Sequence, residues 1–345
     1  MSQLHSEILE QPAVIRRLLD METDRVAGIG RALAGQDIRY VVIAARGTSD
    51  NAARYGQYVF GALNRLTVAL AAPSLFGLYQ RPPSLKSALV IGISQSGQSP
   101  DIVSVLEEAH RQGAPTIAVT NDPQSPLAEA AQYMLELHAG EELSVAATKT
   151  YTAQLAAIAL LALSLAGQSA RPNALDLIPD AMEKAFQSEP AAQSAAERIA
   201  HNSRCVVVGR GFNYATTFET ALKMKELAYI EAEPYSSADF RHGPIALVET
   251  GFPAVLVAVG ETMRDEMIEL RDALRERGAN LVVLGDDETT RHPDDAWLPV
   301  PGGLPEWLTP LVAILPGQLL AYHLTLARGS DPDRPRTLHK VTLTY

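Results

Sequence analysis

A continuous apolar run in the first half of the chain ends in a cluster of hydroxyl side chains. Residues 88–93, Ala-Leu-Val-Ile-Gly-Ile, have the composition of a strand that is buried on both faces of a parallel sheet. Ser94-Gln-Ser-Gly-Gln-Ser99 follows, and Pro100 then opens a segment with helical spacing of apolar residues. The pattern predicts a strand, a turn and a helix in that order.

A turn of this kind can bind an anion, because the free N–H groups at the start of the helix point into it. The hydroxyls of Ser94, Ser96 and Ser99 and the amide of Gln95 add neutral donors that suit a phosphate monoester. An ordinary strand-to-helix loop capped by a serine would contain the same residue types. The string alone leaves both interpretations open.

Similar apolar runs recur along both halves of the chain, with helical patterns between them. Those of the two halves lie about 165 residues apart, as Val90 and Val255 do, which indicates an internal duplication. Strands that alternate with helices form parallel sheets. We therefore predict an α/β fold of two doubly wound, three-layer domains. The expected strands are 39–45, 67–71, 88–93, 115–119 and 133–138, then 204–208, 254–259, 280–284 and 296–300.

The predicted organisation has five parts, with the sheet domains in the second and fourth. Gly260-Glu-Thr-Met occupies the position of the serine loop in the second half and has fewer hydroxyls, so we expect one phosphate site per chain, in the first half. The parts are N-terminal helices at 1–35 with a break at Gln11-Pro12, a domain at 36–170, a helical linker at 171–200, a domain at 201–330 and a tail at 331–345.

Composition narrows the choice of partners. The chain has 345 residues and a net charge of −11 without a basic cluster, which argues against nucleic acid. Cys205 is the single cysteine and lies in an apolar run, as a buried side chain would. Residues 153–166 are too short to span a membrane, and 308–326 are interrupted at Pro316, so both predict buried helices. Without a visible signal peptide, we expect a cytoplasmic protein that has no membrane partner.

Nine short strings, in a fixed order from residue 10 to residue 340, resemble one family. It is the double sugar-isomerase (SIS) module, found as the isomerase half of glutamine–fructose-6-phosphate aminotransferase and alone in SIS-type glucosamine-6-phosphate deaminases. The strings are Glu10-Gln-Pro12, Gly47-Thr-Ser49, Ser94-Gln-Ser-Gly97, Ser144-Val-Ala-Ala-Thr-Lys149, Glu219-Thr-Ala-Leu-Lys-Met-Lys-Glu226, Glu233-Pro-Tyr235, His242-Gly-Pro244, Gln318-Leu-Leu-Ala-Tyr-His323 and Pro335-Arg-Thr-Leu-His-Lys340.

The resemblance implies a role for each matching residue. Glu226 would move a proton between C1 and C2 of the sugar, with Lys223 beside it. His242 would open the sugar ring from a neighbouring subunit, which implies at least a homodimer, and Lys340 would form a Schiff base with the ketose. His339 would add its backbone to the site. The positions that would bind the sugar phosphate are Gly47, Thr48, Ser49, Ser94, Gln95, Ser96, Ser99, Val145 and Ala146.

The residues themselves support these roles unequally. A carboxylate in a partly dry cleft suits proton transfer next to a carbonyl, and Lys223 and Glu226 share a helix face. A lone Lys-x-x-Glu is more often an exposed ion pair, but Ala221, Leu222, Leu227 and Ala228 flank this one. His242, in a Gly-Pro loop, would otherwise be interpreted as a surface histidine. The tail that contains Lys340 has a disordered composition.

Two departures separate the chain from the aminotransferase. Arg46 replaces a small residue or cysteine, and Ala147 replaces a serine. We also expect no glutamine-hydrolysing domain before residue 1 to supply ammonia. We therefore expect a deaminase that converts glucosamine 6-phosphate to fructose 6-phosphate and ammonia, with no cofactor. Glu141-Glu142 has no partner histidine, so we expect no metal. The alternatives are a deglycase of a sugar-phosphate–amino-acid adduct, a galactosamine-series deaminase, an aminotransferase-type isomerase, and a sugar-phosphate sensor without turnover.

Overall fold

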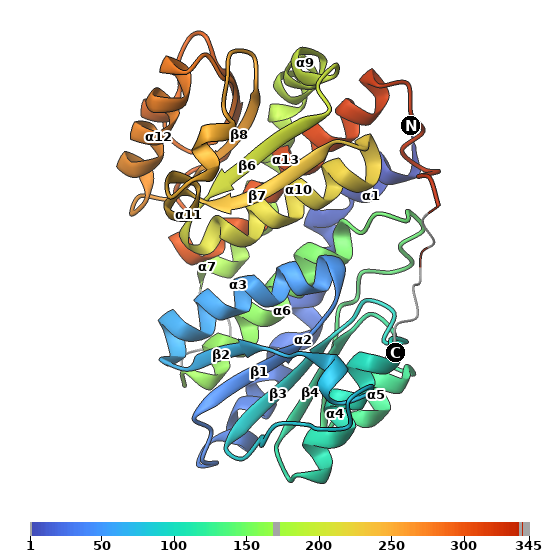
Figure 1. The fold of residues 1–345 in the computed structure, drawn as a ribbon. Helices are drawn as coiled ribbons and strands as arrows, with labels where there is room; N and C mark the ends of the chain where they lie inside the picture. Colours follow the sequence, from blue (N-terminus) through green and yellow to red (C-terminus); the bar gives the residue numbers. More distant parts are fainter. Residues whose placement is uncertain (1, 168–172, 338–339, 341–345) are drawn as a thin grey trace. The chain divides into compact units, whose positions relative to one another are not determined.

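The structure is a computed structural model that describes residues 2–167, 173–337 and 340. The chain forms two compact units, each built on one sheet (Figure 1). The first unit contains the described residues of Ala13–Glu142 and Lys149–Asp176, together with Lys340. The second unit contains those of Met1–Pro12, Leu143–Thr148 and Leu177–Leu338.

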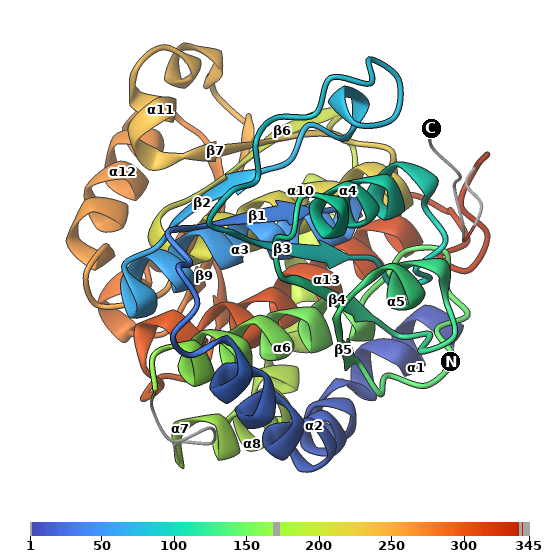
Figure 2. The same cartoon turned by 90° about the horizontal axis from the view of Figure 1, so that it is seen from below.

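The sheet of the first unit has five parallel strands in the order β2-β1-β3-β4-β5 (Figure 2). All six residues of β3 are buried, as predicted for a central strand of a parallel sheet. The strands are β1 (Tyr40–Ala44), β2 (Thr67–Leu70), β3 (Ala88–Ile93), β4 (Thr116–Thr120) and β5 (Tyr133–Glu136).

Helices cover both faces of this sheet. On one face Val90 and Ala118 pack with Leu106 of α4 and Leu127 of α5. On the other, α3 and α6 meet at Gly56, where any side chain would collide with Ile43 of β1. The helices are α2 (Gln11–Leu33), α3 (Gly47–Asn64), α4 (Pro100–Arg111), α5 (Pro126–Ala130), α6 (Lys149–Leu165) and α7 (Asn173–Asp176), with a 3₁₀ turn η1 at Pro73–Leu75.

The sheet of the second unit repeats this topology. Its order, β10-β9-β8-β6-β7, becomes that of the first sheet when the strands are renumbered from β6, and all pairs are parallel. The shared order supports the predicted internal duplication. The strands are β6 (Arg204–Gly209), β7 (Glu231–Ser236), β8 (Pro253–Ala258), β9 (Asn280–Gly285) and β10 (Ala296–Pro299).

The sequence-based prediction missed β7. This strand contains Pro234 and the exposed residues Glu231 and Glu233, so it lacks the apolar run that marked the other strands. It lies at the edge of the sheet and pairs only with β6 among the described strands. An edge strand needs one hydrogen-bonded side, which is why it tolerates a proline and two acidic side chains.

The second unit is also covered on both faces. Met267, Leu270 and Leu274 of α12 pack on the side of Val206 and Leu256, whereas α10 lies against β6 and β7 and packs with α13. The helices are α1 (Gln3–Leu9), α8 (Ile178–Ala185), α9 (Glu189–Ile199), α10 (Tyr214–Ala228), α11 (Ser237–Arg241), α12 (Arg264–Glu276) and α13 (Pro310–Ala327), with 3₁₀ turns η2 (Phe186–Ser188), η3 (Gly211–Asn213), η4 (Pro244–Leu247), η5 (Glu288–Thr290) and η6 (Glu306–Leu308).

Both long apolar segments are buried helices, as predicted, but the predicted break at Pro316 is wrong. Pro316 lies inside α13, which continues to Ala327. Gly317 lets Thr220 of α10 approach so closely that a Cβ would lie 2.4 Å from its hydroxyl oxygen. Burial on all sides thus outweighs the hydrogen bond that proline removes. Segment Glu306–Ala327 is long and apolar enough to span a membrane, but 83% of its apolar window is buried in the protein.

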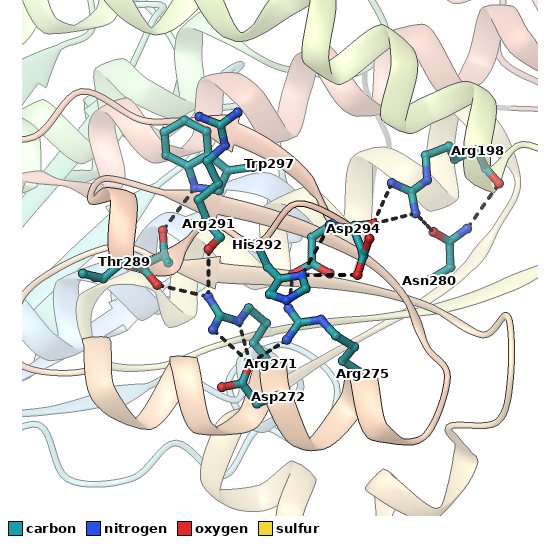
Figure 3. Close-up of polar contacts among 12 residues, drawn as sticks. Arg198, Arg271, Asp272, Arg275, Asn280, Thr289, Arg291, His292, Asp294 and Trp297 are labelled. Atoms are coloured by element: carbon teal, nitrogen blue, oxygen red, sulfur yellow. Dashed lines mark hydrogen bonds and ion pairs between the residues drawn. The ribbon is translucent and has the colours of Figure 1, made fainter.

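Two arginines of α12 bind the segment between β9 and β10 through hydrogen bonds and an ion pair (Figure 3). Arg271 donates to the carbonyl oxygens of Thr289 and Arg291, at 3.1 and 3.5 Å. The Arg291 guanidinium lies over the Trp297 ring, 5.6 Å from its centroid. Arg275 contributes two further ion pairs, with Asp272 and with Asp295. All of these contacts lie within the second unit, so the cluster has a structural role.

Candidate functional site

The serine loop of the first unit lies where parallel α/β sheets bind ligands. Strands β1 and β3 are neighbours, with Ala44 opposite Gly92, and their chains leave the sheet in opposite directions along the strand order. Ligands of such folds bind at this switch point, beyond the carboxyl ends of the strands. Arg46–Ser49 follows β1 and Ser94–Ser99 follows β3, so the structure brings the two predicted phosphate-binding strings together.

The backbone of the serine loop is held by its own hydroxyls. Ser94 Oγ accepts a hydrogen bond from Gly97 N at 3.1 Å, and Ser96 Oγ accepts one from Gln98 N at 3.3 Å. A hydroxyl that accepts in this way keeps its hydrogen for donation to another group. Ser99 is the N-cap residue of α4, and Pro100 is the first residue of the helix, as predicted. The loop therefore presents hydroxyl donors at the start of a helix, which favours an anion.

Gly97 is the residue on which the shape of this loop depends most. Its φ is +64°, and a Cβ there would lie 2.1 Å from Ser125 Oγ. Gly97→Ala is expected to destabilise the protein by about 2–4 kcal/mol, from overpacking plus left-handed strain, and to abolish the rise in melting temperature that we expect on addition of a phosphosugar. Gly113→Ala is the matched control, because φ is +77° there but the space is empty. Equal effects of the two substitutions in urea unfolding and ligand-shift measurements would refute this prediction.

A hydrogen bond from helix α6 supports the segment that follows β1. Ser49 is buried, and its hydroxyl accepts a hydrogen bond from Gln154 Nε2 of α6 at 2.9 Å. Helix α3 begins at Gly47, so the Gly-Thr-Ser string, which has the composition of a turn, forms the first turn of the helix. Gly47, with φ of +54°, makes this start possible after the extended Arg46. Thr48 and Ser49 thus lie in the first turn of a helix rather than in a free loop.

The equivalent loop of the second unit is already occupied by a carboxylate of the protein. Gly260 N, directly after β8, donates to Asp286 Oδ2 at 3.0 Å. The adjoining cavity, about 540 Å³, is also lined by Glu261 and Glu306 and by Arg264, which lies 3.6 Å from Asp286 Oδ1. Three carboxylates beside one guanidinium disfavour a phosphate, which agrees with the expectation of one phosphate site, in the first half of the chain.

Lys223 and Glu226 form part of a buried chain of charges on α10. Lys223 Nζ lies 2.7 Å from Glu226 Oε2 and 3.3 Å from Glu219 Oε1. Side-chain exposure is 0% for Glu219, 1% for Lys223 and 26% for Glu226. The alternative of a solvent-exposed ion pair is therefore wrong. Of the two carboxylates, Glu226 is the one with access to solvent.

The lysine of this chain stays charged. Burial by itself would lower the pKa of Lys223, but the carboxylates of Glu219 and Glu226 outweigh it and raise the pKa above its ordinary value. Because the raised pKa lies above that of the unfolded chain, the pairing stabilises the fold while the ammonium group and its carboxylate partners are charged, and this contribution is lost as the pH rises through the raised pKa of Lys223. Lys223 is consequently a fixed cation beside Glu226 and is unsuited to act as a nucleophile.

Lys340 forms an ion pair with Glu142, a residue whose sequence pattern raised only the question of a metal site. Its Nζ lies 2.8 Å from Glu142 Oε2 in the first unit. Glu142 has 0% side-chain exposure and also accepts from Thr150 N and Thr150 Oγ1, at 3.1 and 2.8 Å. A buried carboxylate with three donors is well satisfied and fixes the place of the ammonium group.

The tail before Lys340 is tied to the second unit, contrary to the disorder that its composition suggests. Asp333 accepts from Gln3 N and Leu4 N, at 2.8 and 2.9 Å, at the start of α1. Arg336 lies over the Tyr229 ring, 4.3 Å from its centroid. These contacts offset the entropy of ordering the segment. His339 lies outside the described residues.

Val145 and Ala146 belong to a short segment of the second unit that a buried glutamate fixes. Glu7 of α1 has 0% exposure and accepts hydrogen bonds from Leu143 N and Ser144 N. The backbone just before Val145 is therefore held in place. The match to a family string indicated this segment, but nothing in the local sequence indicated that Glu7 supports it.

His242 is exposed and ends α11, with its backbone N–H bonded to Asp239 O at 3.1 Å. In the described part of the chain, no residue forms a hydrogen bond or ion pair with its imidazole. The same residues contain no group of three or more His, Cys, Asp and Glu side chains that could hold a metal ion.

Several residues that hold the site segments in place were not predicted, because their roles depend on contacts between residues distant in sequence. Glu7 is a single acidic residue with no distinctive local pattern, and Glu142 was considered only as half of the Glu141-Glu142 pair. Gln154 lies in an apolar helix, where a buried amide is a signal that could have been noticed. Glu219 was quoted in a family string, and its i, i+4 spacing to Lys223 was a further signal.

The chain has two five-stranded parallel sheets, and in each a loop after the central strand, β3 or β8, leads into a helix. This arrangement defines an α/β protein of two similar domains. A family model, SIS domain, matches residues 36–164 and 198–328. The chain therefore belongs to the SIS family, as the resemblance implied.

Comparison with individual proteins agrees with this. The chain is 34% identical over 343 residues to glutamine–fructose-6-phosphate aminotransferase of Thermococcus kodakarensis, covering 97% of this chain and 56% of that one. It thus spans little more than half the length of such relatives. A candidate phosphosugar isomerase from Silicibacter pomeroyi DSS-3 is 34% identical with a TM-score of 0.85, over 96% of this chain and 100% of that one. Glucosamine-6-phosphate deaminase of Thermotoga maritima, at 22% identity and a TM-score of 0.81 over 99% and 100%, shows the shared fold alone.

Proposed function

We propose that this protein is a phosphosugar isomerase that deaminates an amino-sugar phosphate, with glucosamine 6-phosphate giving fructose 6-phosphate and ammonia. The observation that carries the proposal is the buried Glu219–Lys223–Glu226 chain, in which Glu226 alone reaches solvent. A carboxylate next to a fixed cation is suited to take up and return a proton.

In the proposed reaction one set of residues binds the substrate and another transfers protons. The serine loop, with Thr48 and Ser49, binds the phosphate, and Val145 and Ala146 line the sugar. His242 moves the proton that opens the ring. Glu226 removes the proton from C2, and the C1 aldehyde accepts the electron pair as an enol forms. Glu226 then returns the proton to C1, and one proton of the C2 amino group passes to O1, which leaves an imine at C2.

The release of ammonia completes the reaction, and no oxidant or reductant is needed. The ε-amino group of Lys340 adds to the C2 imine and expels ammonia, and water then hydrolyses the lysine Schiff base to give the ketose. Lys340 must be neutral to attack, and Glu142, 2.8 Å from its Nζ, is placed to receive the proton. One water molecule is consumed for each ammonia released.

The names of the relatives support this class of substrate. The aminotransferase of T. kodakarensis handles fructose 6-phosphate by name, and the S. pomeroyi protein is named for phosphosugar isomerisation. The choice of deamination over synthesis rests on this chain's own departures at Arg46 and Ala147.

The proposal is tested by the release of ammonia from glucosamine, galactosamine and mannosamine 6-phosphates, and by the release of the free amino acid from fructosamine 6-phosphate adducts of amino acids. We expect release from glucosamine 6-phosphate by the wild-type protein and none by Glu226→Gln. Release from an adduct alone would replace the proposal with a deglycase. No release from any compound, together with a phosphosugar-dependent rise in melting temperature, would favour a sensor.

The exposed His242 leads to a second expectation, that this side chain serves the site of a partner subunit in a homodimer. Glu226→Gln and His242→Ala proteins, each inactive, are mixed and allowed to exchange subunits. Half of the dimers are then mixed, and each has one site with both wild-type residues, so about a quarter of wild-type activity should return. No recovery after exchange, verified by mass spectrometry of labelled subunits, would place both residues in one chain. A cytoplasmic location remains part of the proposal.

A further inference from the structure

Arg46 forms an ion pair with the helix that follows the serine loop. Its Nε lies 2.9 Å from Asp101 Oδ2. Arg46 is the N-cap residue of α3, and Asp101 is the second residue of α4. The pair therefore joins the starts of the two helices that follow β1 and β3, at the switch point of the first sheet.

The two partners differ in their access to water. Asp101 has 2% side-chain exposure, whereas Arg46 keeps 50% of its side-chain surface exposed. The second Asp101 oxygen accepts from Ile102 N at 2.9 Å, within the same helix turn. The charge of Asp101 is thus fixed at the start of α4, where the serine loop would place a phosphate.

An acidic side chain in the first turn of a helix stabilises that helix, because it interacts with the positive end of the dipole. It also competes for the same electrostatic position with any anion that the loop binds. A buried carboxylate is screened little by water, so its repulsion of a nearby phosphate dianion is strong unless a cation neutralises it.

We propose that Arg46 is a specificity-determining residue: by neutralising Asp101, it lets the serine loop accept a doubly charged phosphate. This inference rests on the proposed function, because it assumes that the loop binds a phosphosugar. The other ion pair on α3, Asp50 with Arg54 at 3.2 Å, is neutral in itself. Removing Arg46 alone therefore leaves one excess negative charge beside the phosphate.

The test is a double-mutant cycle on phosphosugar affinity. Arg46→Gln is expected to weaken binding of fructose 6-phosphate, measured by calorimetry at fixed ionic strength, by roughly tenfold or more. Arg46→Gln combined with Asp101→Asn is expected to restore the dissociation constant to within about threefold of wild type. The kcat of Arg46→Gln should change little, because the effect belongs to binding.

Two further variants separate charge from structure. Arg46→Lys keeps the cation and should bind within about threefold of wild type, even if the geometry of the pair is poorer. Arg111→Gln removes the same charge at the other end of α4, where Arg111 pairs with Glu108 on the surface, and should leave affinity unchanged. Circular dichroism and melting temperature report whether Arg46→Gln is folded.

The outcomes distinguish this inference from the function on which it rests. A wild-type protein that binds no phosphosugar would overturn both. Equal affinity of wild type and Arg46→Gln would overturn the inference alone. A double variant as weak as Arg46→Gln would also overturn it, because neutralisation of Asp101 would then not be what Arg46 contributes.

Discussion

Glu226→Gln is expected to abolish turnover of the amino-sugar phosphate while the protein remains folded. The amide cannot accept the C2 proton, and loss of a general base typically lowers kcat by about 10²–10⁴-fold. Lys223 keeps Glu219 as a partner 3.3 Å away, so the substitution leaves no buried charge unpaired. Glu226 is also partly exposed, and we expect a stability change below about 1 kcal/mol.

The experiment needs a control for the change from carboxylate to amide. Glu231→Gln serves, because Glu231 lies on β7 of the same unit, 79% exposed and 3.8 Å from Arg204. It should retain full activity. Binding of fructose 6-phosphate by Glu226→Gln should persist, since the proposed phosphate donors lie on other elements. A variant that retains more than a tenth of wild-type kcat would show that another group takes the proton.

Strands with all residues buried could be predicted from the sequence, because burial on two faces requires an unbroken apolar run. Ala88–Ile93 is such a strand, and its predicted bounds are those of β3. Strand β7 could not be predicted in this way, since an edge strand is stabilised by hydrogen bonds on one side and imposes few demands on its side chains. The start of α3 at Gly47 was missed for a related reason, because a Gly-Thr-Ser string has the composition of a turn.

The site residues were predicted from short sequence motifs, and the structure shows which contacts connect these motifs. Gln11 and Gln318 belong to two strings 307 residues apart, and their side chains form a buried hydrogen bond of 2.7 Å. Neither residue has a local signal for this pairing. Glu226 and Lys223 could be paired from their spacing, and the apolar residues that flank them argued against an exposed pair, although α10 as a whole is polar enough to be an exposed helix.

Lys223→Met is expected to cause the largest loss of stability among single substitutions in the charge chain, about 3–5 kcal/mol. Methionine fills much of the same volume, so packing changes little, but Glu219 loses the ammonium group 3.3 Å away and remains fully buried. Breaking one side of a buried ion pair costs more than the pair itself contributes, because the desolvation of the remaining charge is no longer offset. Urea unfolding of the purified protein measures this loss.

The double variant Glu219→Gln with Lys223→Met tests the cause. If the cost comes from the Glu219 carboxylate that loses the ammonium group of Lys223, the neutral pair should recover more than half of the lost free energy of unfolding. A loss that is unchanged in the double variant would mean that the lysine acts through packing. The charge of Lys223 would then have no effect on Glu226. This result would contradict the proposal that Glu226 carries the proton beside a fixed cation.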